Sequence, residues 1–345
     1  MDNAASEDTP SYPASGSHHR VMPEVEEEGE LREFIVLLPK AELHLHIEGT
    51  LEPELMFTLA KRNGVQPPFA TVAQARAAYN FNNLDDFLRL YYAATDVLRT
   101  AADFEDLTWE YLKRAHADGV VHVEPFFDPQ SHLPRGVPMS EVVDGITAGL
   151  RRGEQELGIS WKLIMCFLRH LSEENALETL AAAKPHLASI HGVGLDSSES
   201  GNPPSKFARV FAKARGLGLR AVAHAGEEGP AEYIWEALDL LLVERIDHGI
   251  RAQDDPDLIL RLAQEGIPLD LCPLSNQRLQ VVPDLIDFPA VALLTAGVTI
   301  TISSDDPAYF GGYIVDNYLA LARAQGLSRA QLADIAAASL RVSWR

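Results

Sequence analysis

Short apolar runs alternate with longer amphipathic stretches along most of the chain. From about residue 35 onward there are eight such runs: AELHLHIEG, GVVHVEPFFDP, WKLIMCFLR, IHGVGLDSSE, LRAVAHAGE, RIDHGI, IPLDLCPLSN and VTITISSDDP. Between most of them lie stretches with the apolar spacing of helices, such as PAEYIWEALDLLLV and DPDLILRLAQEG. Strands that alternate with helices form parallel sheets, and eight such units match an α/β fold of the closed (β/α)8 TIM-barrel type. An open doubly wound sheet is the alternative, but no G-x-G-x-x-G or G-x-x-x-x-G-K-[ST] motif follows any run, which weakens it.

Two segments depart from this alternation. About 70 residues separate the first run from the second, and they contain the helical patterns EPELMFTLAKRNG and NLDDFLRLYYAATDVLRTAADFEDLTWEYLKRAHADG. We therefore expect a helical insertion over about residues 51–117 that covers the mouth of the barrel and could act as a lid. Residues 1–32 are rich in Ser, Pro, Glu and Asp, which predicts a flexible acidic arm before a barrel that covers residues 33–345.

Composition and charge narrow the class of protein. The 345 residues are 46% hydrophobic, which is enough for a sizeable core, and 50 acidic against 29 basic residues give a net charge of −21. Such a charge disfavours nucleic acid as a partner. Cys166 and Cys272 are too few for a disulfide framework, and the chain has neither a signal-peptide core nor a long apolar span. We expect a cytoplasmic protein with no membrane partner and a small molecule as its ligand.

Polar residues that can bind a metal stand where several of the predicted strands end. His44 and His46 are separated by one residue, so both side chains leave the same face of their strand. Later strand ends carry His224, Glu227 and Glu228 in HAGEE, Asp247 and His248 in RIDHG, and Asp305 and Asp306 in SSDDP. One histidine at a strand end is most often structural, and Asp-Asp-Pro is also ordinary turn composition. Because the C-terminal ends of barrel strands converge, the recurrence predicts a divalent metal site, and its nitrogen-rich set favours zinc.

Glu227 is a candidate proton donor. It follows His224 by three residues and is expected at the start of a helix, where the helix dipole favours the charged carboxylate. A partly dry pocket that also holds other carboxylates would favour the protonated form, and a neutral acid beside a metal site donates protons well. The alternative is an ordinary carboxylate of a helix N-terminus, but Gly226 and Gly229 indicate a close approach of the backbone.

Five motifs resemble those of one known family. HLHIEG, HAGEE, DHG, CPLSN and SSDDPAYFGGY, in this order, resemble the adenosine/adenine deaminase family of metal-dependent amidohydrolases, and the resemblance covers roughly residues 35–345. GLDSSESGNPP and DDPAYFGGY are more similar to the adenine deaminase branch of bacteria and fungi. The nucleoside-specific enzymes typically read D-L-A-G-D-E where this chain has LDSSES.

The resemblance implies a metal site and a reaction. His44, His46, His224 and Asp305 would hold one Zn²⁺, with Fe²⁺ as the alternative, and a water would complete the coordination. The metal would lower the pKa of this water so that hydroxide attacks C6 of a 6-aminopurine. Adenine would be converted to hypoxanthine and ammonia, which is a reaction of purine salvage.

The resemblance also implies a role for four further residues. His248 would take a proton from the water and steady the hydroxide, and Glu227 would protonate N1 of the purine. Asp306, directed away from the metal by the alternation of the strand, would contact N7, and the N–H of Gly194 would donate to N3.

The choice between base and nucleoside depends on N9, which carries hydrogen in adenine and ribose in adenosine. Glu199 is our candidate acceptor for the N9 hydrogen, and ribose would collide with it. Its alternative is an exposed carboxylate in a loop. Phe81, Leu84 and Phe87 of the expected insertion could cover the face of the base.

Three other functions compete with this one. The nearest is deamination of adenosine or of another 6-aminopurine derivative. A second is a metal-dependent hydrolase of cyclic amides or phosphoesters on the same barrel, but such sites often use a carboxylated lysine at a strand end, and Lys162 lies near the start of its strand. A third is a non-catalytic purine-binding protein, which would lack a metal ligand or the acid.

Overall fold

The computed structural model of the protein describes residues 28–345. Residues 1–27, most of the arm predicted over residues 1–32, lie outside the described residues. The first described element, α1 (Glu28–Leu37), crosses the predicted boundary at residue 33. It packs against α15 (Ile314–Gln325), and Arg32 pairs with Asp316 at this contact.

All eight predicted runs contain β-structure. The strands are β1 (Lys40–Glu42), β2 (Val120–Val123), β3 (Phe126–Phe127), β4 (Ser160–Trp161), β5 (Ile164–Leu168), β6 (Gly192–Asp196), β7 (Arg220–Ala225), β8 (Arg245–His248), β9 (Leu269–Leu271) and β10 (Ile300–Ile302). The second run divides into β2 and β3 around Pro125, which has no N–H to offer a neighbouring strand. The third run divides into β4 and β5. The pairings among these described strands are all parallel, as the alternation with helices predicts.

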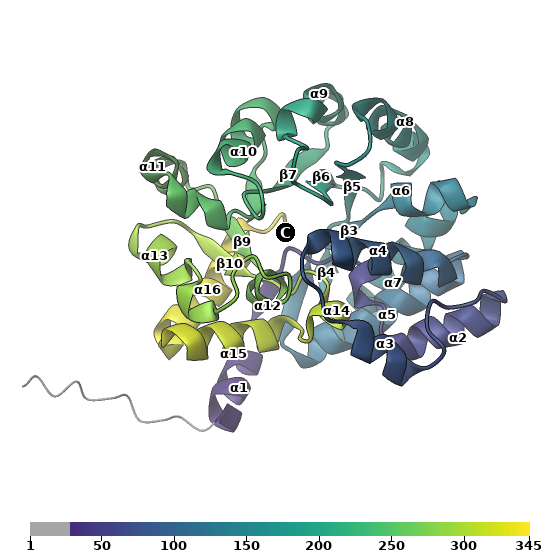
Figure 1. Ribbon diagram of the computed structural model, residues 1–345, viewed down its shortest axis with the longest axis horizontal. Coiled ribbons are helices and arrows are strands. Elements are labelled where there is room, and N and C mark those ends of the chain that lie inside the picture. The colour runs from purple at the N-terminus through teal and green to yellow at the C-terminus, as the bar shows by residue number, and fades with distance from the viewer. Residues whose placement is uncertain (1–27) are drawn as a thin grey trace, which may run out of the picture.

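The sheet closes on itself through the first and the last runs. Strands β10-β9-β8-β7-β6-β5-β3 form one ladder and β1-β2-β4 another. Beyond β1, Leu45 bridges to Asp305 and His46 bridges to Phe126. The N–H of His46 donates to the carbonyl of Asp305 at 3.0 Å, and the N–H of Asp305 donates to the carbonyl of His44 at 3.1 Å. These bridges join the ladders into a ring of strands surrounded by helices (Figure 1), which confirms the predicted TIM barrel.

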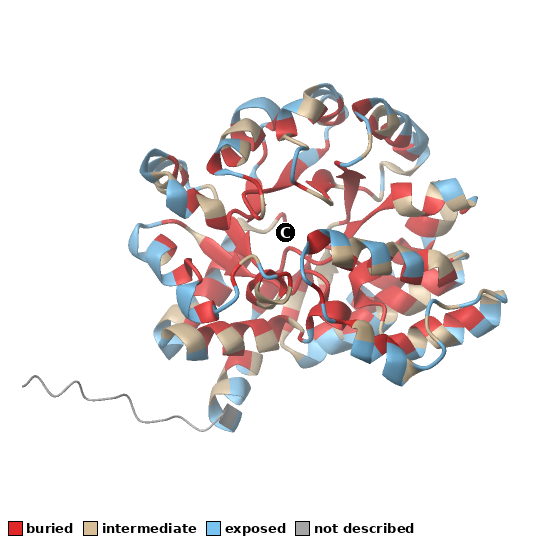
Figure 2. Cartoon of the chain, viewed as in Figure 1, coloured by how far each residue is buried: buried red, intermediate tan, exposed pale blue. Residues whose placement is uncertain are grey.

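The outer layer consists of helices that follow the strands. They are α7 (Met139–Leu157), α8 (Glu173–Ala183), α9 (Ala208–Gly216), α10 (Ala231–Glu236), α11 (Pro256–Glu265), α13 (Ala290–Thr295), α15 and α16 (Arg329–Val342). Shorter helices lie in the loops: α6 (Pro129–His132), α12 (Pro273–Arg278) and α14 (Pro307–Phe310). Buried residues follow the strands and the helix faces that meet them, whereas exposed residues lie on the outer helix faces (Figure 2). The core therefore lies between the sheet and the helical layer.

The segment between the first and second runs forms α2 (Pro53–Asn63), α3 (Val72–Ala78), α4 (Leu84–Ala94) and α5 (Ala101–Ala117). Gly145, Gly149 and Gly153 of α7 let α5 pack closely, since a Cβ on each would lie only 2.3–2.7 Å from α5 atoms. Helix α5 thus belongs to the outer layer of the barrel. One helix is enough to connect the first strand with the second, and α5 has that place. The inserted helices are therefore α2–α4, a shorter segment than the predicted insertion over residues 51–117.

The C-terminal residues close the N-terminal end of the barrel. Trp344 is buried and packs inside the ring with Phe126, Ile164, Cys166 and Val222. Figure 1 places the C-terminus near the centre of the ring. The cavity that the strands surround is filled at this end, and the pocket described next lies at the other end.

Candidate active site

A pocket lies at the C-terminal ends of the strands. It contains about 390 Å³ of space not filled by protein atoms, including the solvent at its mouth. Apolar side chains of α4 form part of its wall, and strand ends supply the polar groups. The lining residues are His46, Leu84, Phe87, Leu88, Tyr91, Asp128, Asp196, Ser197, His224, Glu227, His248, Leu279, Asp305, Asp306 and Phe310.

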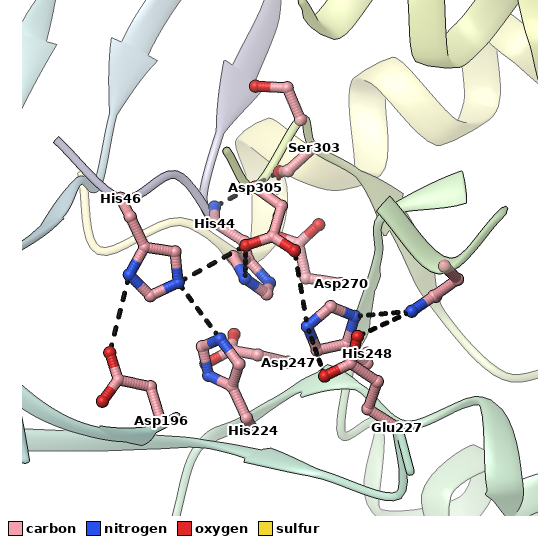
Figure 3. Close-up of polar contacts among 12 residues, drawn as sticks. His44, His46, Asp196, His224, Glu227, Asp247, His248, Asp270, Ser303 and Asp305 are labelled. Carbon is pink, nitrogen blue, oxygen red and sulfur yellow. Dashed lines mark hydrogen bonds and ion pairs between the residues drawn. The ribbon is translucent and has the colours of Figure 1, made fainter. Parts of the chain in front are cut away.

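Four buried side chains converge on one point of this pocket. His44, His46, His224 and Asp305 each place one ligand atom within 4.8 Å of the others. The Oδ1 atom of Asp305 lies 3.2 Å from Nε2 of His44 and 3.4 Å from Nε2 of His46. The Nε2 atoms of His46 and His224 are 3.2 Å apart (Figure 3). Three imidazole nitrogens and one carboxylate oxygen directed at one point fit a zinc or iron ion.

Closure of the barrel brings these ligands together. His44 and His46 flank the residue that bridges to Asp305, so the first and last runs deliver their ligands to the same place. The hydroxyl of Ser303 accepts hydrogen bonds from the N–H groups of Leu43 and His44, both at 3.2 Å. Asp305 has a φ of 65°, a left-handed conformation that costs a non-glycine residue roughly 1–2 kcal/mol. Strain of this kind is concentrated at functional sites.

The protonation states of the cluster suit a metal ion. Burial lowers the pKa of His46 to about 4, so its imidazole is neutral at physiological pH. Burial alone would raise the pKa of Asp305, but His44, His248 and His46 together hold it well below its usual range. Metal ligands must be unprotonated. The neutral imidazole of His46 and the ionised carboxylate of Asp305 are therefore in the forms that a divalent cation needs.

Buried carboxylates face the other nitrogens of two histidines of the cluster. Oδ2 of Asp196 lies 3.5 Å from Nδ1 of His46, and Oδ2 of Asp247 lies 3.6 Å from Nδ1 of His224. Arg245 in turn reaches Asp247 at 3.2 Å. Such outer partners orient the ring of a ligand histidine and set its tautomer.

Glu227 and His248 lie beside the metal cluster. Nε2 of His248 is 3.6 Å from Oε2 of Glu227 and 3.8 Å from Oδ2 of Asp305. The side-chain amide of Asn276 donates to Oε1 of Glu227 at 2.9 Å. Burial raises the pKa of the Glu227 carboxyl well above its usual range, and the charges of Asp305 and nearby glutamates add to this shift. Burial also lowers the pKa of His248. The site therefore pairs a carboxylic acid with a neutral imidazole.

Comparison with known proteins identifies the family. The family model described as "Adenosine deaminase" matches residues 39–345. An adenine deaminase of Zymomonas mobilis is 60% identical over 306 residues, which cover 89% of this chain and 91% of the relative. One of Stutzerimonas stutzeri is 57% identical over 90% of this chain and 98% of the relative. The chain belongs to the adenosine deaminase family.

Two solved structures have the same fold. The crystal structure of adenine deaminase from Arthrobacter aurescens has a TM-score of 0.87 and 51% identity, and the match covers 89% of this chain and 94% of that one. A zinc-bound amidohydrolase from Burkholderia ambifaria has a TM-score of 0.85 and 28% identity, covering 94% and 90% of the two chains. Within residues 28–345, no helix combines the length and apolar character of a membrane-spanning segment.

The position expected for Glu227 within this family site needs a correction. Glu227 does not begin a helix, because α10 starts only at Ala231. It lies in the turn between β7 and α10, and Gly226 has a φ of 70° at the start of that turn. The dipole of α10 is therefore not the influence that sets the ionisation of Glu227.

Glu199 does not face the pocket as expected. Its Oε1 accepts the N–H of Gly226 at 2.7 Å. Its Oε2 accepts the N–H groups of Glu227, Glu228 and Gly229 at 3.0, 2.9 and 2.8 Å. A carboxylate with four backbone donors, buried to 1% exposure, has no free oxygen for a hydrogen on N9. Glu199 instead holds the turn that carries Glu227.

The two aspartates at the end of the last run do not point apart by strand alternation. Strand β10 ends at Ile302, and both Asp305 and Asp306 line the pocket. The left-handed backbone of Asp305 turns the chain, and Asp306 stands at the N-cap of α14. Burial raises the pKa of Asp306 well above its usual range, and the neighbouring Asp305 adds to the shift.

Gly194, which was expected to donate its N–H to N3 of the purine, lies within the barrel below the pocket. It pairs with Cys166 in the middle of β6, and a Cβ on Gly194 would lie 2.4 Å from Sγ of Cys166. Gly194 is not among the lining residues, whereas Ser197, three residues later with a φ of 74°, is. The structure therefore does not support contact between the N–H of Gly194 and N3.

The apolar cover agrees with the sequence for two residues of three. Leu84 and Phe87 of α4 line the pocket. Phe81 lies behind them, with its ring 5.4 Å from that of Phe87 and 6.3 Å from that of Phe310. It supports the wall rather than forming it.

Several polar residues of the site escaped the sequence analysis. Asp128 and Asp196 line the pocket, and Asn276 binds Glu227. Asp128 precedes Pro129 at the end of the second run, just as Asp306 precedes Pro307 at the end of the eighth. An aspartate at a strand end was therefore the signal that could have found Asp128 and Asp196.

Proposed function

We propose that the protein is a metal-dependent adenine deaminase that hydrolyses adenine to hypoxanthine and ammonia. The observation that carries this proposal is the position of the buried Glu227 carboxyl, 3.6 Å from His248 and beside the four-residue metal cluster. Relatives with 57–60% identity are named adenine deaminases. The resemblance in sequence and the arrangement of the side chains support the same reaction.

His44, His46, His224 and Asp305 would hold one divalent metal, which we propose is zinc. Zinc is bound in the amidohydrolase from Burkholderia ambifaria, and the histidine-rich set also suits Fe²⁺. When bound, such a metal lowers the pKa of water towards about 7 and so supplies a nucleophile at neutral pH.

The other residues handle protons and hold the base. In the net reaction a C6–O bond forms, the bond from C6 to the amino nitrogen breaks, and ammonia leaves. His248, neutral because of its burial, can accept a proton from the attacking water. Glu227, protonated because of its burial, can donate to N1, so that the ring accepts electrons without a full negative charge. Asp306 would contact N7 from the neighbouring wall of the pocket.

Parallel assays on purified, zinc-loaded protein test this function. The loss of adenine absorbance and the release of ammonia should show rapid turnover of adenine, with adenosine and N6-methyladenine much slower. Glu227→Gln should reduce kcat by at least about 100-fold, because general acid catalysis contributes about 10²–10⁴-fold. Glu232→Gln, an exposed glutamate at the start of α10, is the matched control. Turnover of adenosine in preference to adenine, or no turnover of either by zinc-loaded protein, would refute the proposal.

A further inference from the structure

Asp128 is a buried carboxyl for which the proposed mechanism has no role. It lies one residue beyond β3, lines the pocket and is 2% exposed. Its Oδ2 accepts a hydrogen bond from the hydroxyl of Tyr91 at 3.4 Å. Its Oδ1 is buried and has no hydrogen-bond partner within the described structure. A buried polar atom without a partner is costly, so its presence in a pocket indicates a ligand group.

Each of the other carboxyls around Asp128 has another role to fill, although each also has one buried oxygen without a hydrogen-bond partner within the described residues. Asp196 faces Nδ1 of His46 at 3.5 Å. Glu48 accepts from Nε2 of His132 at 2.7 Å and from the N–H of Asp128 at 3.1 Å. Asp306 is the group that the proposed function places at N7. Glu48 is not among the lining residues, and Asp196 and Asp306 face a histidine of the cluster and N7, so Asp128 is the lining aspartate that is left for another edge of the substrate.

Asp128 and Glu227 lie in different electrostatic surroundings. After burial itself, the charges that most affect the pKa of Asp128 are those of Asp196 and Glu48, with Asp306 also contributing. Those that affect Glu227 are Asp305, Glu228 and Glu199. Asp128 follows β3 and Glu227 follows β7, and β5 and β6 separate these two strands, so the two acids belong to different walls of the pocket. Asp306 lies on the Asp128 side: a Cβ on Gly49 would lie 2.0 Å from Oδ1 of Asp306, and the neighbouring Glu48 accepts the N–H of Asp128 at 3.1 Å.

The shape of adenine indicates which wall of the pocket its remaining edge faces. N1 and N7 flank C6, whereas N3 and N9 lie on the edge opposite to C6. A base with N1 at Glu227 and N7 at Asp306 turns its N3 and N9 towards the wall that carries Asp128. We propose that Asp128 recognises this N3/N9–H edge of adenine and so makes the pocket specific for the free base. The assignment deepens, and rests on, the proposed adenine deaminase activity.

The chemistry of the edge suits a carboxyl group. N9–H is a donor and N3 is an acceptor, and a carboxylic acid offers a matching acceptor and donor side by side. The raised pKa of Asp128 is consistent with such a neutral acid but is not needed for acceptance from N9–H. A substituent on N9 removes the donor and occupies the space of the carboxyl, which would exclude nucleosides.

The test compares adenine with 9-methyladenine, which differs only in that the N9 hydrogen is replaced. Asp128→Ala removes both hydrogen-bonding atoms and should lower kcat/KM for adenine by about 10- to 100-fold, the loss expected for a buried unpaired donor. Its kcat/KM for 9-methyladenine should stay equal or rise. Asp128→Asn keeps one donor and one acceptor and should retain most of the preference for adenine. Asp334→Asn, on the exposed face of α16, is the matched control.

The outcomes separate this inference from the proposed function. A fall of at least tenfold in the adenine/9-methyladenine ratio for Asp128→Ala, with Asp128→Asn close to wild type, supports the assignment. An unchanged ratio in folded, zinc-loaded Asp128→Ala overturns it, even though the wild type deaminates adenine. If Asp128→Ala fails to fold, Asp128→Leu decides, because it fills the space of the carboxyl without any hydrogen-bonding atom. A fall of at least tenfold in the adenine/9-methyladenine ratio of folded Asp128→Leu supports the assignment, and an unchanged ratio overturns it. A wild type inactive on adenine would instead refute the proposed function itself.

Discussion

Replacement of Glu199 by glutamine tests how the Glu227 turn is held. In the wild type, the Glu199 carboxylate accepts four N–H groups from residues 226–229. In Glu199→Gln, one carboxylate oxygen becomes an NH₂ group. If the amide oxygen faces residues 227–229, the NH₂ group confronts the N–H of Gly226. Two donors then face each other in a buried place, and the turn must shift.

The magnitude follows from this count of hydrogen bonds. One buried donor without a partner costs about 1–3 kcal/mol. The three remaining bonds lose their charge, and neutral hydrogen bonds are about half as strong as charged ones. We expect a total loss of roughly 3 kcal/mol in the free energy of unfolding. Each 1.36 kcal/mol added to the barrier lowers the rate by a factor of about 10. If half or more of the loss falls on the position of Glu227, kcat for adenine should drop by about 10- to 100-fold.

The assay should also reveal a change in pH dependence. The charge of Glu199 contributes, after burial and the charges of Asp305 and Glu228, to the raised pKa of Glu227. In the proposed reaction Glu227 must be protonated to donate to N1, so activity should be lost as the pH rises through its pKa. Without the Glu199 charge that pKa falls, and the alkaline limb of the kcat profile should move to lower pH. We would measure kcat and KM across pH 6–10 together with urea unfolding, and use Glu232→Gln as the control. A kcat within twofold of wild type and an unmoved alkaline limb would show that the reasoning is wrong.

Three further predictions concern metal and stability. Chelation of the metal, or His44→Asn, should abolish adenine turnover and lower Tm. A ligand at 100 times its Kd adds about 2.7 kcal/mol to the free energy of unfolding, and this contribution would be lost. Metal analysis and thermal scans would check this. Burial lowers the pKa of Lys40 from 10.5 to about 8. Between these two pH values the Lys40 amine is therefore protonated in the unfolded protein but largely unprotonated in the folded protein. The free energy of unfolding should rise by up to roughly 3 kcal/mol as the pH increases from 8 to 10.5. Lys40→Met should lack that rise. If urea titrations gave the wild type and Lys40→Met the same slope of unfolding free energy against pH, the prediction would be wrong. Arg245→Met should lower the free energy of unfolding in urea by about 3–5 kcal/mol, because it leaves the buried Glu124 and Asp247 without their cation. A decrease below about 1 kcal/mol would count against this.

Patterns local to the chain predicted the fold and a metal site at the ends of the strands. Alternation of apolar runs with helical stretches determines a parallel sheet, because each strand must be covered by the helix that follows it. His44, His46, His224 and Asp305 could be placed at strand ends because strand direction alone decides which end of a barrel a residue reaches. Their convergence within 4.8 Å agrees with that expectation.

Errors arose where a side chain's direction depends on the backbone after a strand ends. The direction of Asp305 depends on a left-handed φ, and no alternation rule applies beyond Ile302. Glu199 was expected to face the substrate as the acceptor for the N9 hydrogen, but a loop carboxylate can point either way. The N–H groups that attract it belong to residues 226–229, which are distant in sequence.

The sequence by itself thus determined the barrel, the element order and the strand-end positions of the candidate metal ligands, since these follow from periodicity and strand polarity. The choice of four ligands among the strand-end residues came from the resemblance to the family. Only the tertiary structure decided which carboxyl serves which partner. Glu199 holds a turn, Asp196 orients His46, and Asp128 keeps a free oxygen in the pocket. The physical reason is that a carboxylate has the same acceptors everywhere. Its role is assigned by the donors that folding brings to it.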